Sequence, residues 1–304
     1  MIHRPNALQT TERLREISTE AQLDFPHIAI ESDLEQFAVG CSSWHWHEYF
    51  EFALVSGGDM ELQTQRSSRI IRAGEGYFVN ANVLHLCRVV DGSARTRLHV
   101  HQFGRELLSG TGFIRQKYLL PLESCAGLES MHLRADDPRH AALMDALRAA
   151  YAQAEAEPED WGLGVSLHLL AAWKGLYSLA QPLLQQPGPI SSADGDRIKL
   201  MLAYIHSHYA EPIGVQNIAR AAGICTRECF RCFQQSLSTT PTLYLMRFRV
   251  NAAARQLIDS DRSITEIAAD CGFSSPSYFC KVFHDRIGRS PRAFRTQMRN
   301  EKAP

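Results

Sequence analysis

Two segments in the C-terminal third of this 304-residue chain share one pattern, and the repeat limits the possible folds more than any other feature. Ile218-Ala219 and Gly223 recur 49 residues later as Ile267-Ala268 and Gly272. Past the glycine the offset is 50, which one residue inserted in the turn explains. At that offset Arg231 matches Lys281, Phe233 matches Phe283, Pro241 matches Pro291 and Tyr244 matches Phe294. Both segments are therefore expected to form the same structural unit.

Each segment reads as a short helix, a turn at the glycine, a second helix and then a new helix that begins with proline. Thr240-Pro241 and Ser290-Pro291 each supply a hydroxyl cap followed by proline at the first helical position. Ser263 and Glu266 have the spacing of a capping box. Two helices joined by a tight glycine turn are typical of a helix-turn-helix unit. The pattern predicts two such units.

The second helix of each unit has an apolar face and a polar face. Cys229 and Phe233 are expected to face inward in the first unit, and Phe279, Phe283 and Ile287 in the second. The predicted DNA-contacting residues are those on the outer faces: Arg227, Phe230, Arg231, Gln234, Ser277, Cys280, Lys281 and His284. Arginines there are suited either to guanine edges or to phosphate, and the pattern leaves both open.

The charge distribution supports a DNA partner. Residues 191–304 carry 16 Lys and Arg against 10 Asp and Glu, whereas residues 1–190 carry 16 against 23. A basic C-terminal part beside an acidic N-terminal part suggests that only the former meets a polyanion.

The chain shows no signal peptide and no apolar run of membrane-spanning length, because Lys174 and Pro182 interrupt the most apolar segment, around residues 167–184. Its eight cysteines are too few for a disulfide framework. A soluble, cytoplasmic protein with no membrane partner is expected.

The N-terminal part changes from strand-like to helical patterns. Residues 12–23 suggest a short helix, and strands are expected at 50–55, 60–65, 76–79 and 97–103. Helical patterns follow at 141–151 and 164–184, and residues 185–194 read as a linker. The expected fold is α+β: a β-rich, cupin-like barrel with flanking helices at 1–184, the linker, and an all-α domain with two helix-turn-helix units at 195–304.

Residues 263–295 resemble the C-terminal signature of the AraC/XylS family of bacterial transcription regulators. The matching positions are Ile267-Ala268, Gly272-Phe273, Ser277-Tyr278-Phe279, Phe283, Gly288, Pro291 and Arg295. Residues 213–249 resemble the first unit of that family more loosely, since Cys225 replaces the usual serine and Cys229 the usual leucine. The resemblance implies that a long helix over 241–259 joins the units. Both recognition helices would then enter adjacent major grooves, about 34 Å apart.

The N-terminal part contains a group of candidate binding residues, most of them histidines. His45, His47 and Glu51, followed by His85, resemble the cupin motif and share strand parity. Three histidines and a carboxylate suit a divalent metal, an organic effector or a merely structural cluster. The family resemblance favours a small-molecule effector, bound by His45, Trp46, His47, Glu51 and His85, with no metal or cofactor. His99 and His101 share a strand face and are candidates to join this pocket.

Cys225, Cys229 and Cys232 have the spacing of a radical SAM iron–sulfur motif. They fall on a predicted recognition helix, where Cys229 fills an inward position, so no cluster is expected.

The sequence thus predicts a non-enzymatic, sequence-specific transcription regulator of the AraC/XylS type that responds to a small-molecule effector. The alternative is a metal-dependent cupin enzyme with an appended DNA-binding domain. The expected partners are double-stranded DNA, the effector, a second copy of the chain bound through the N-terminal helices, and RNA polymerase.

Overall fold

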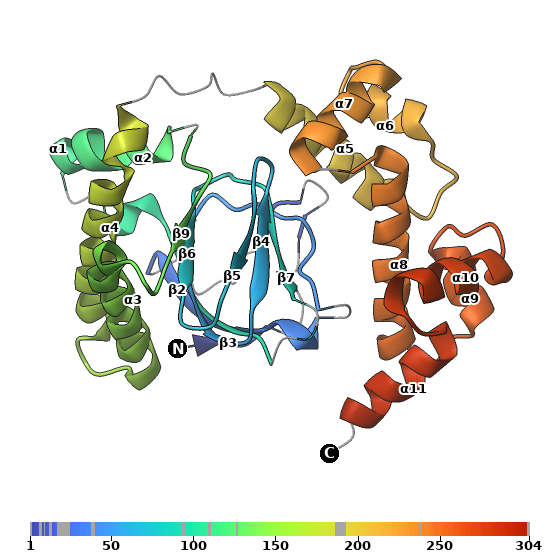
Figure 1. The fold of residues 1–304 in the computed structure, drawn as a ribbon, viewed down its shortest axis with the longest axis horizontal. Coiled ribbons are helices and arrows are strands. Elements are labelled where there is room, and N and C mark those ends of the chain that lie inside the picture. The colour runs from blue at the N-terminus through green and yellow to red at the C-terminus, as the bar shows by residue number, and fades with distance from the viewer. Residues whose placement is uncertain are drawn as a thin grey trace. The chain divides into compact units, whose positions relative to one another are not determined.

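The computed structural model describes residues 2–5, 8, 10–11, 14–16, 25–37, 40–90, 92, 95–108, 111–125, 127–185, 193–237 and 239–302. The chain divides into two compact units, one containing residues 15–192 and the other residues 193–304 (Figure 1). The first unit is β-rich with flanking helices and the second is helical, as the sequence predicts.

Two sheets form the framework of the N-terminal unit. The larger has the order β1 (Ile2–His3), β2 (His27–Asp33), β8 (Arg97–Phe103), β3 (Phe50–Gly57), β6 (Gly76–Val79), β9 (Ser130–Leu133). The smaller has the order β5 (Ser68–Ile71), β4 (Met60–Thr64), β7 (His85–Val89). All neighbouring strands are antiparallel except the short pair β1 and β2. The four predicted strands are confirmed as β3, β4, β6 and β8, whereas the other five were not predicted.

Strand β3 separates two apolar cores because successive side chains of a strand point to opposite faces. Ala53 and Val55 point between the sheets, where Leu62 of β4 belongs to the same cluster. Phe50 and Phe52 point the other way, into the core that the larger sheet shares with the helices. Every residue of β3 from 50 to 55 is buried, which explains its continuous apolar run.

Two long helices, α3 (Pro138–Ala156) and α4 (Trp161–Leu184), run along one side of the sheets (Figure 1). Leu143, Leu147 and Tyr151 of α3 are buried on the predicted face. The short elements of this unit are η2 (Leu34–Gln36), η3 (Arg105–Leu107), α1 (Gly112–Ile114), η4 (Arg115–Leu119) and α2 (Leu120–Glu123). No helix among the described residues has the length and apolar character needed to cross a bilayer.

Two sequence expectations fall largely outside the described residues. Most of the helix predicted at residues 12–23 lies outside the described part of the chain. Within it, Arg15 forms an isolated β-bridge with Trp46, and Glu16 forms one with Thr10. Most of the predicted linker, residues 186–192, also lies outside the described part, and α5 begins at Ala193.

The described part of the C-terminal unit contains seven helices, and their order reproduces the repeat. They are α5 (Ala193–His208), α6 (Val215–Ala221), α7 (Thr226–Leu237), α8 (Pro241–Asp259), α9 (Ile264–Asp270), α10 (Pro276–Ile287) and α11 (Pro291–Lys302). The predicted long helix is confirmed as α8. The predicted caps also form: Thr240 Oγ1 accepts from the amide of Leu243, and Ser263 and Glu266 complete a capping box.

The two turn glycines have the same backbone conformation but different surroundings. Gly223 has φ +65° and Gly272 has φ +76°, a left-handed region that side chains with a Cβ rarely adopt. A Cβ at Gly272 would lie 2.6 Å from the Tyr209 carbonyl oxygen, whereas one at Gly223 would meet no atom within 4 Å.

This difference predicts unequal stability losses. Gly223→Ala should cost about 1–2 kcal/mol, because only the left-handed conformation is penalised. Gly272→Ala should cost at least about twice as much, because the added methyl also overlaps a backbone oxygen. Urea denaturation of the two full-length variants and the parent chain measures both free energies. Equal losses would show that the close approach at Gly272 does not govern the second turn.

Candidate functional site

Helix α7 presents the polar face that its sequence predicts. Cys229 and Phe233 are fully buried. The four residues predicted to contact DNA, Arg227, Phe230, Arg231 and Gln234, are all exposed. An exposed phenylalanine on a basic helix is suited to apolar contact with a base edge.

Arg231 is held in place by its own helix. Its Nε donates to Glu228 Oε2 at 2.9 Å, and its Nη1 contacts Gln235 Oε1. Glu228 also lies 3.7 Å from Arg197 Nη1 of α5. The guanidinium of Arg231 therefore lies along the outer face of α7, where partial exposure leaves it accessible.

Helix α10 repeats this arrangement with a different polar face. Phe279 and Phe283 are fully buried, while Ile287, predicted to face inward, is only partly buried. Of the predicted DNA-contacting residues, Ser277, Lys281 and His284 are exposed and Cys280 is half-buried. Tyr278, which was not predicted to contact DNA, is exposed on the first turn of α10.

Other basic residues of this unit hold the backbone. Arg249 donates to the carbonyl oxygens of Tyr209 and Glu211, both at 2.7 Å, just before α6. Arg295 donates to the carbonyl oxygen of Arg262 at 2.6 Å, just before α9. These guanidinium groups fix the segments that lead into the two units.

The three closely spaced cysteines do not converge, and only Cys229 and Cys232 belong to α7, since Cys225 directly precedes it. Cys225 is exposed, whereas Cys229 and Cys232 are buried. Burial raises the pKa of the Cys229 thiol to about 12, which keeps it protonated and unreactive. The predicted placement on the recognition helix is confirmed for Cys229 and Cys232 and wrong for Cys225.

In the N-terminal unit, four of the predicted effector-binding residues lie together between the two sheets. One ring nitrogen from each of His45, His47 and His85 lies within 4.8 Å of the other two. A pair of backbone hydrogen bonds between His45 and His85 places their ring centroids 4.2 Å apart. The Glu51 Oε2 atom lies 3.1 Å from His47 Nε2 and 4.0 Å from His85 Nε2. At most 5% of each of these side chains is exposed.

The sequence did not predict two further members of this cluster. Tyr77 OH donates to Glu51 Oε1 at 3.0 Å, and Gln102 Nε2 donates to Glu51 Oε2 at 3.1 Å. Antiparallel registry pairs Glu51 with Gln102 on the neighbouring strand, so the pairing of β3 with β8 would have revealed this partner. Gln102 also donates to Glu16.

The cluster holds its groups in different protonation states. Burial lowers the pKa of His45 strongly and that of His85 to about 4, so both are neutral near pH 7. Burial also opposes a charge on His47, but its hydrogen bond to Glu51 raises its pKa overall. Burial opposes the Glu51 charge, yet the His47 hydrogen bond and the neighbouring histidines hold the pKa of this carboxyl far below its usual value.

The other candidates differ from these four. Trp46 stands between His45 and His47 in the chain and is half-buried, whereas the four clustered residues are buried. His99 and His101 do not join the cluster, because the inward residue of this stretch of β8 is Gln102. His101 instead bonds His27 and the Leu147 carbonyl oxygen on the helical side of the sheet.

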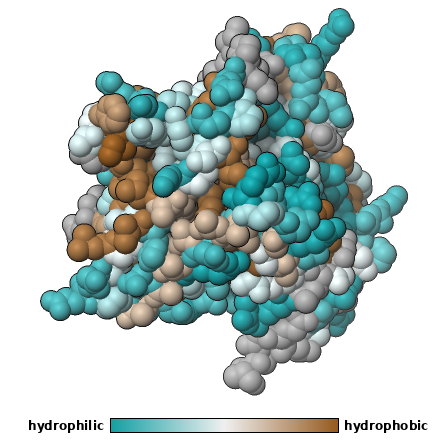
Figure 2. Space-filling model, turned by 60° about the vertical axis from the view of Figure 1, so that its left-hand side comes forward, coloured by the Kyte–Doolittle hydropathy of each residue, from teal (hydrophilic) through white to brown (hydrophobic). Residues whose placement is uncertain are grey.

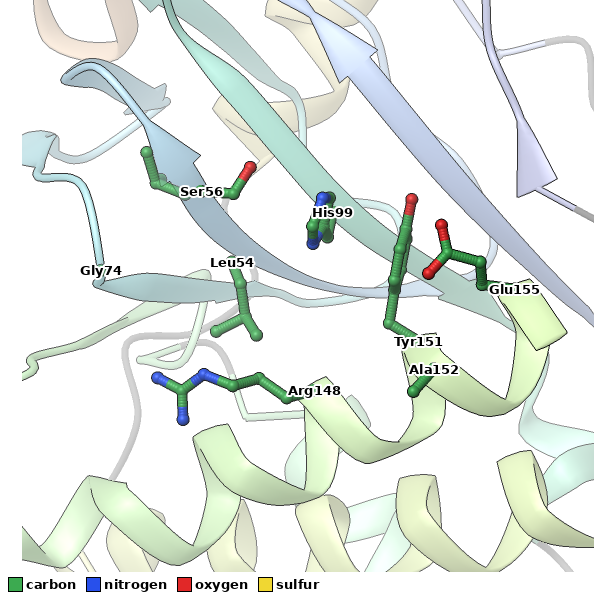
Figure 3. Close-up of a pocket in the computed structure, with 9 residues that line it drawn as sticks. Leu54, Ser56, Gly74, His99, Arg148, Tyr151, Ala152 and Glu155 are labelled. Carbon is green, nitrogen blue, oxygen red and sulfur yellow. The ribbon is translucent and has the colours of Figure 1, made fainter.

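A pocket of about 400 Å³ opens between the sheet and α3 (Figure 3). His99 stacks on Tyr151 with ring centroids 4.0 Å apart, and Glu155 lies beside Tyr151. The Tyr151 hydroxyl is buried and has no hydrogen-bond partner among the described residues. Arg148 lines the same pocket and pairs with Asp145. The volume of this pocket falls in the range of small-molecule binding sites.

Two family models match the chain. Residues 33–172 match the AraC-like ligand binding domain, and residues 218–297 match a helix-turn-helix domain. The chain is 24% identical over 284 residues to the HTH-type transcriptional regulator YdeC of Bacillus subtilis, covering 93% of this chain and 96% of YdeC. It is 27% identical over 252 residues to the HTH-type transcriptional activator RhaS of Escherichia coli, covering 83% of this chain and 86% of RhaS.

Among solved structures, the chain is similar to the DNA-binding domain of AdpA, a global transcriptional factor, determined in complex with a target DNA. The sequences are 32% identical, and the alignment covers 34% of this chain and 92% of the AdpA domain, with a TM-score of 0.33.

Proposed function

Because the chain belongs to the AraC/XylS family of DNA-binding transcription regulators, we propose that α7 and α10 are its two base-reading helices and that a small organic effector controls them. The observation that carries this proposal is the duplicated helix-turn-helix, in which the outer faces of both recognition helices remain exposed.

The N-terminal region, residues 1–184, would then act as the sensing and dimerisation domain, joined by the linker to the DNA-binding domain. The relatives are named as transcription regulators, which favours a non-enzymatic role over that of a metal-dependent cupin enzyme. DNA as the main partner favours a cytoplasmic location and a contact with RNA polymerase.

Within the DNA interface, Arg231 is the stronger candidate for base reading. Its planar guanidinium pairs with Glu228 and contacts Gln235 in the free chain, and when released from them it can donate two parallel hydrogen bonds to guanine. Its repeat partner Lys281 is an exposed point charge on α10, which suits phosphate. Arg227 and Gln234 would contact DNA on either side of Arg231, while Ser277, Cys280 and His284 would contact it from α10.

This assignment predicts two different binding defects. Arg231→Ala should weaken binding to the cognate duplex by about 1–3 kcal/mol and binding to scrambled DNA much less, because a base contact is lost. Lys281→Ala should weaken both similarly and reduce the salt dependence, because a phosphate contact is lost. Fluorescence anisotropy at two salt concentrations measures these effects, with the cognate duplex selected from random sequence by the parent protein.

The two variants serve as controls for each other, because they occupy matching positions of the repeat. An unchanged ratio of cognate to scrambled affinity in Arg231→Ala would rule out base reading by this side chain.

For the effector we propose the pocket between the sheet and α3 (Figure 3). Arg148 can bind an acidic group, and the unpartnered hydroxyl of Tyr151 can bond a hydroxyl or carbonyl oxygen. The buried His45, Glu51 and His85 side chains contact one another and leave less room for an organic molecule. The favoured effector class is a small polar acid.

This pocket can be tested with a panel of small hydroxy and sugar acids in a thermal-shift screen. For a compound that stabilises the parent chain, Arg148→Ala and Tyr151→Phe should each weaken binding at least about tenfold, because each removes a polar contact. Arg139→Ala is the matched control, because Arg139 is an exposed residue of α3 outside the pocket. Affinities that the two pocket variants leave unchanged would place the effector elsewhere.

We further propose that the chain dimerises through α4. Leu163, Leu167 and Leu170 lie on one helical face with 76%, 66% and 44% of each residue exposed. Figure 2 shows apolar side chains gathered on this side of the N-terminal unit. Beside them an apolar groove of about 560 Å³ is lined by Tyr118 and Trp173, among others. An apolar surface of this kind usually marks a protein interface, and a second copy of the helix supplies a matching apolar stripe.

Sedimentation of the full chain tests this interface. The parent protein should be a dimer at micromolar concentration, and Leu167→Glu should shift it to monomer because the charge would be buried without a partner. Ile70→Glu is the control, because Ile70 is an equally apolar exposed residue of β5, outside the α4 face. A monomeric parent chain, or a dimer that Leu167→Glu does not affect, would refute dimerisation through α4.

A further inference from the structure

The cluster between the two sheets contains more buried metal-binding side chains than an organic effector pocket requires. We propose that His45, His47 and His85, with Glu51 as fourth ligand, bind one divalent transition-metal ion in the N-terminal domain.

The hydrogen bonds of the three rings occupy the Nδ1 atoms and leave the Nε2 atoms for the cluster. His45 Nδ1 lies 2.9 Å from the Ser43 carbonyl oxygen, and His47 Nδ1 and His85 Nδ1 lie 2.9 Å from the carbonyl oxygens of Tyr49 and Val83. A carbonyl oxygen only accepts, so each Nδ1 must carry the hydrogen. A neutral His45 or His85 ring therefore keeps a lone pair on Nε2, and His47 gains one when a metal ion replaces the proton that it donates to Glu51. A backbone carbonyl on the other ring nitrogen is the usual support of a metal-bound histidine.

One of these nitrogens lacks a hydrogen-bond partner within the described part of the chain. The Nε2 atom of the fully buried His85 makes no hydrogen bond to any described residue. It lies 4.0 Å from Glu51 Oε2, which also only accepts when ionised. A buried acceptor aimed at a carboxylate is unfavourable unless a cation lies between them.

A single proton satisfies only part of this cluster. A proton on His47 can bridge its Nε2 to Glu51, but the buried Nε2 of His85 still has no hydrogen-bond partner among the described residues. A divalent ion accepts all the free lone pairs at once. Ligands of a tetrahedral ion at about 2.0–2.1 Å lie about 3.4 Å apart, so nitrogens now within 4.8 Å need only small side-chain shifts.

The donor set selects the metal class. Three imidazoles and one carboxylate suit Zn²⁺, Fe²⁺, Ni²⁺ or Cu²⁺, whereas Mg²⁺ and Ca²⁺ prefer oxygen donors. Tyr77 and Gln102 both donate to Glu51, so they fix the carboxylate that would face the ion.

Another buried histidine of the same unit provides a contrast. His101 Nδ1 lies 3.0 Å from His27 Nε2, and its other ring nitrogen donates to the Leu147 carbonyl oxygen at 3.1 Å. Both nitrogens are thus occupied by the protein, and this histidine is not expected to bind metal.

Cobalt titration of the tag-free, chelator-treated full chain tests the proposal. Co²⁺ should bind at one ion per chain and give visible ligand-field bands without thiolate charge transfer, because the ligands are nitrogen and oxygen. Added Zn²⁺ should displace it, whereas Mg²⁺ should not. No cobalt uptake by the folded parent chain, or bands showing sulfur ligands, would overturn the proposal.

Two asparagine substitutions locate the ion. His85→Asn should lower the Co²⁺ affinity more than about 100-fold, because a direct ligand is lost. His101→Asn should leave the affinity within about threefold of the parent, since this ring binds no metal. Circular dichroism with chelator checks that each variant is folded; if His85→Asn is not, X-ray absorption of the Zn²⁺-loaded parent must show three imidazole ligands. Unchanged cobalt affinity in folded His85→Asn would contradict the assignment.

Discussion

Burial of an aromatic side chain on the inner face of each recognition helix is the constraint on which DNA recognition depends. Phe233 and Phe283 occupy matching positions of the repeat and are fully buried. Removing such a ring from a core costs about 3–5 kcal/mol, so each helix is fixed in rotation about its axis. That rotation decides which side chains face outward, among them Arg231 and Lys281. The same burial occurs in both units with different outer residues, so under the proposed function the duplicated framework would read two different DNA segments.

In the N-terminal domain, strand β3 is the element whose buried side chains fix the orientation of the candidate site residues. Its outward residues Phe50 and Phe52 bind the sheet to the helices, while its inward residues include Glu51. The buried carboxylate is stabilised by hydrogen bonds from neighbouring strands, so the histidine cluster depends on the same strand pairing as the apolar core. The pocket lined by Tyr151 lies on the opposite side of this sheet. A change in strand pairing would therefore alter both the histidine cluster and the pocket lined by Tyr151.

The sequence predicted features that local patterns determine and missed those that depend on long-range pairing. The repeat, the caps and the 3.6-residue period located α7, α8 and α10 closely. Strand parity brought His45, His47 and Glu51 together, but it did not show whether the candidates His99 and His101 join them, and both lie on the helical side of the sheet. Parity left this open because only the pairing of β8 with β3 shows that Gln102 points inward. The pocket beside Tyr151 was also missed, because it forms between a helix and a strand far apart in sequence.

The central claim is that both helix-turn-helix units contact DNA at once. Hydroxyl-radical footprinting of the full chain on a selected operator tests it most directly. Each half-site should show two protected segments centred about 10–10.5 base pairs apart on one face of the duplex, because two recognition helices would occupy successive major grooves. A single protected segment in each half-site would contradict the claim, since only one of the two units would then contact DNA.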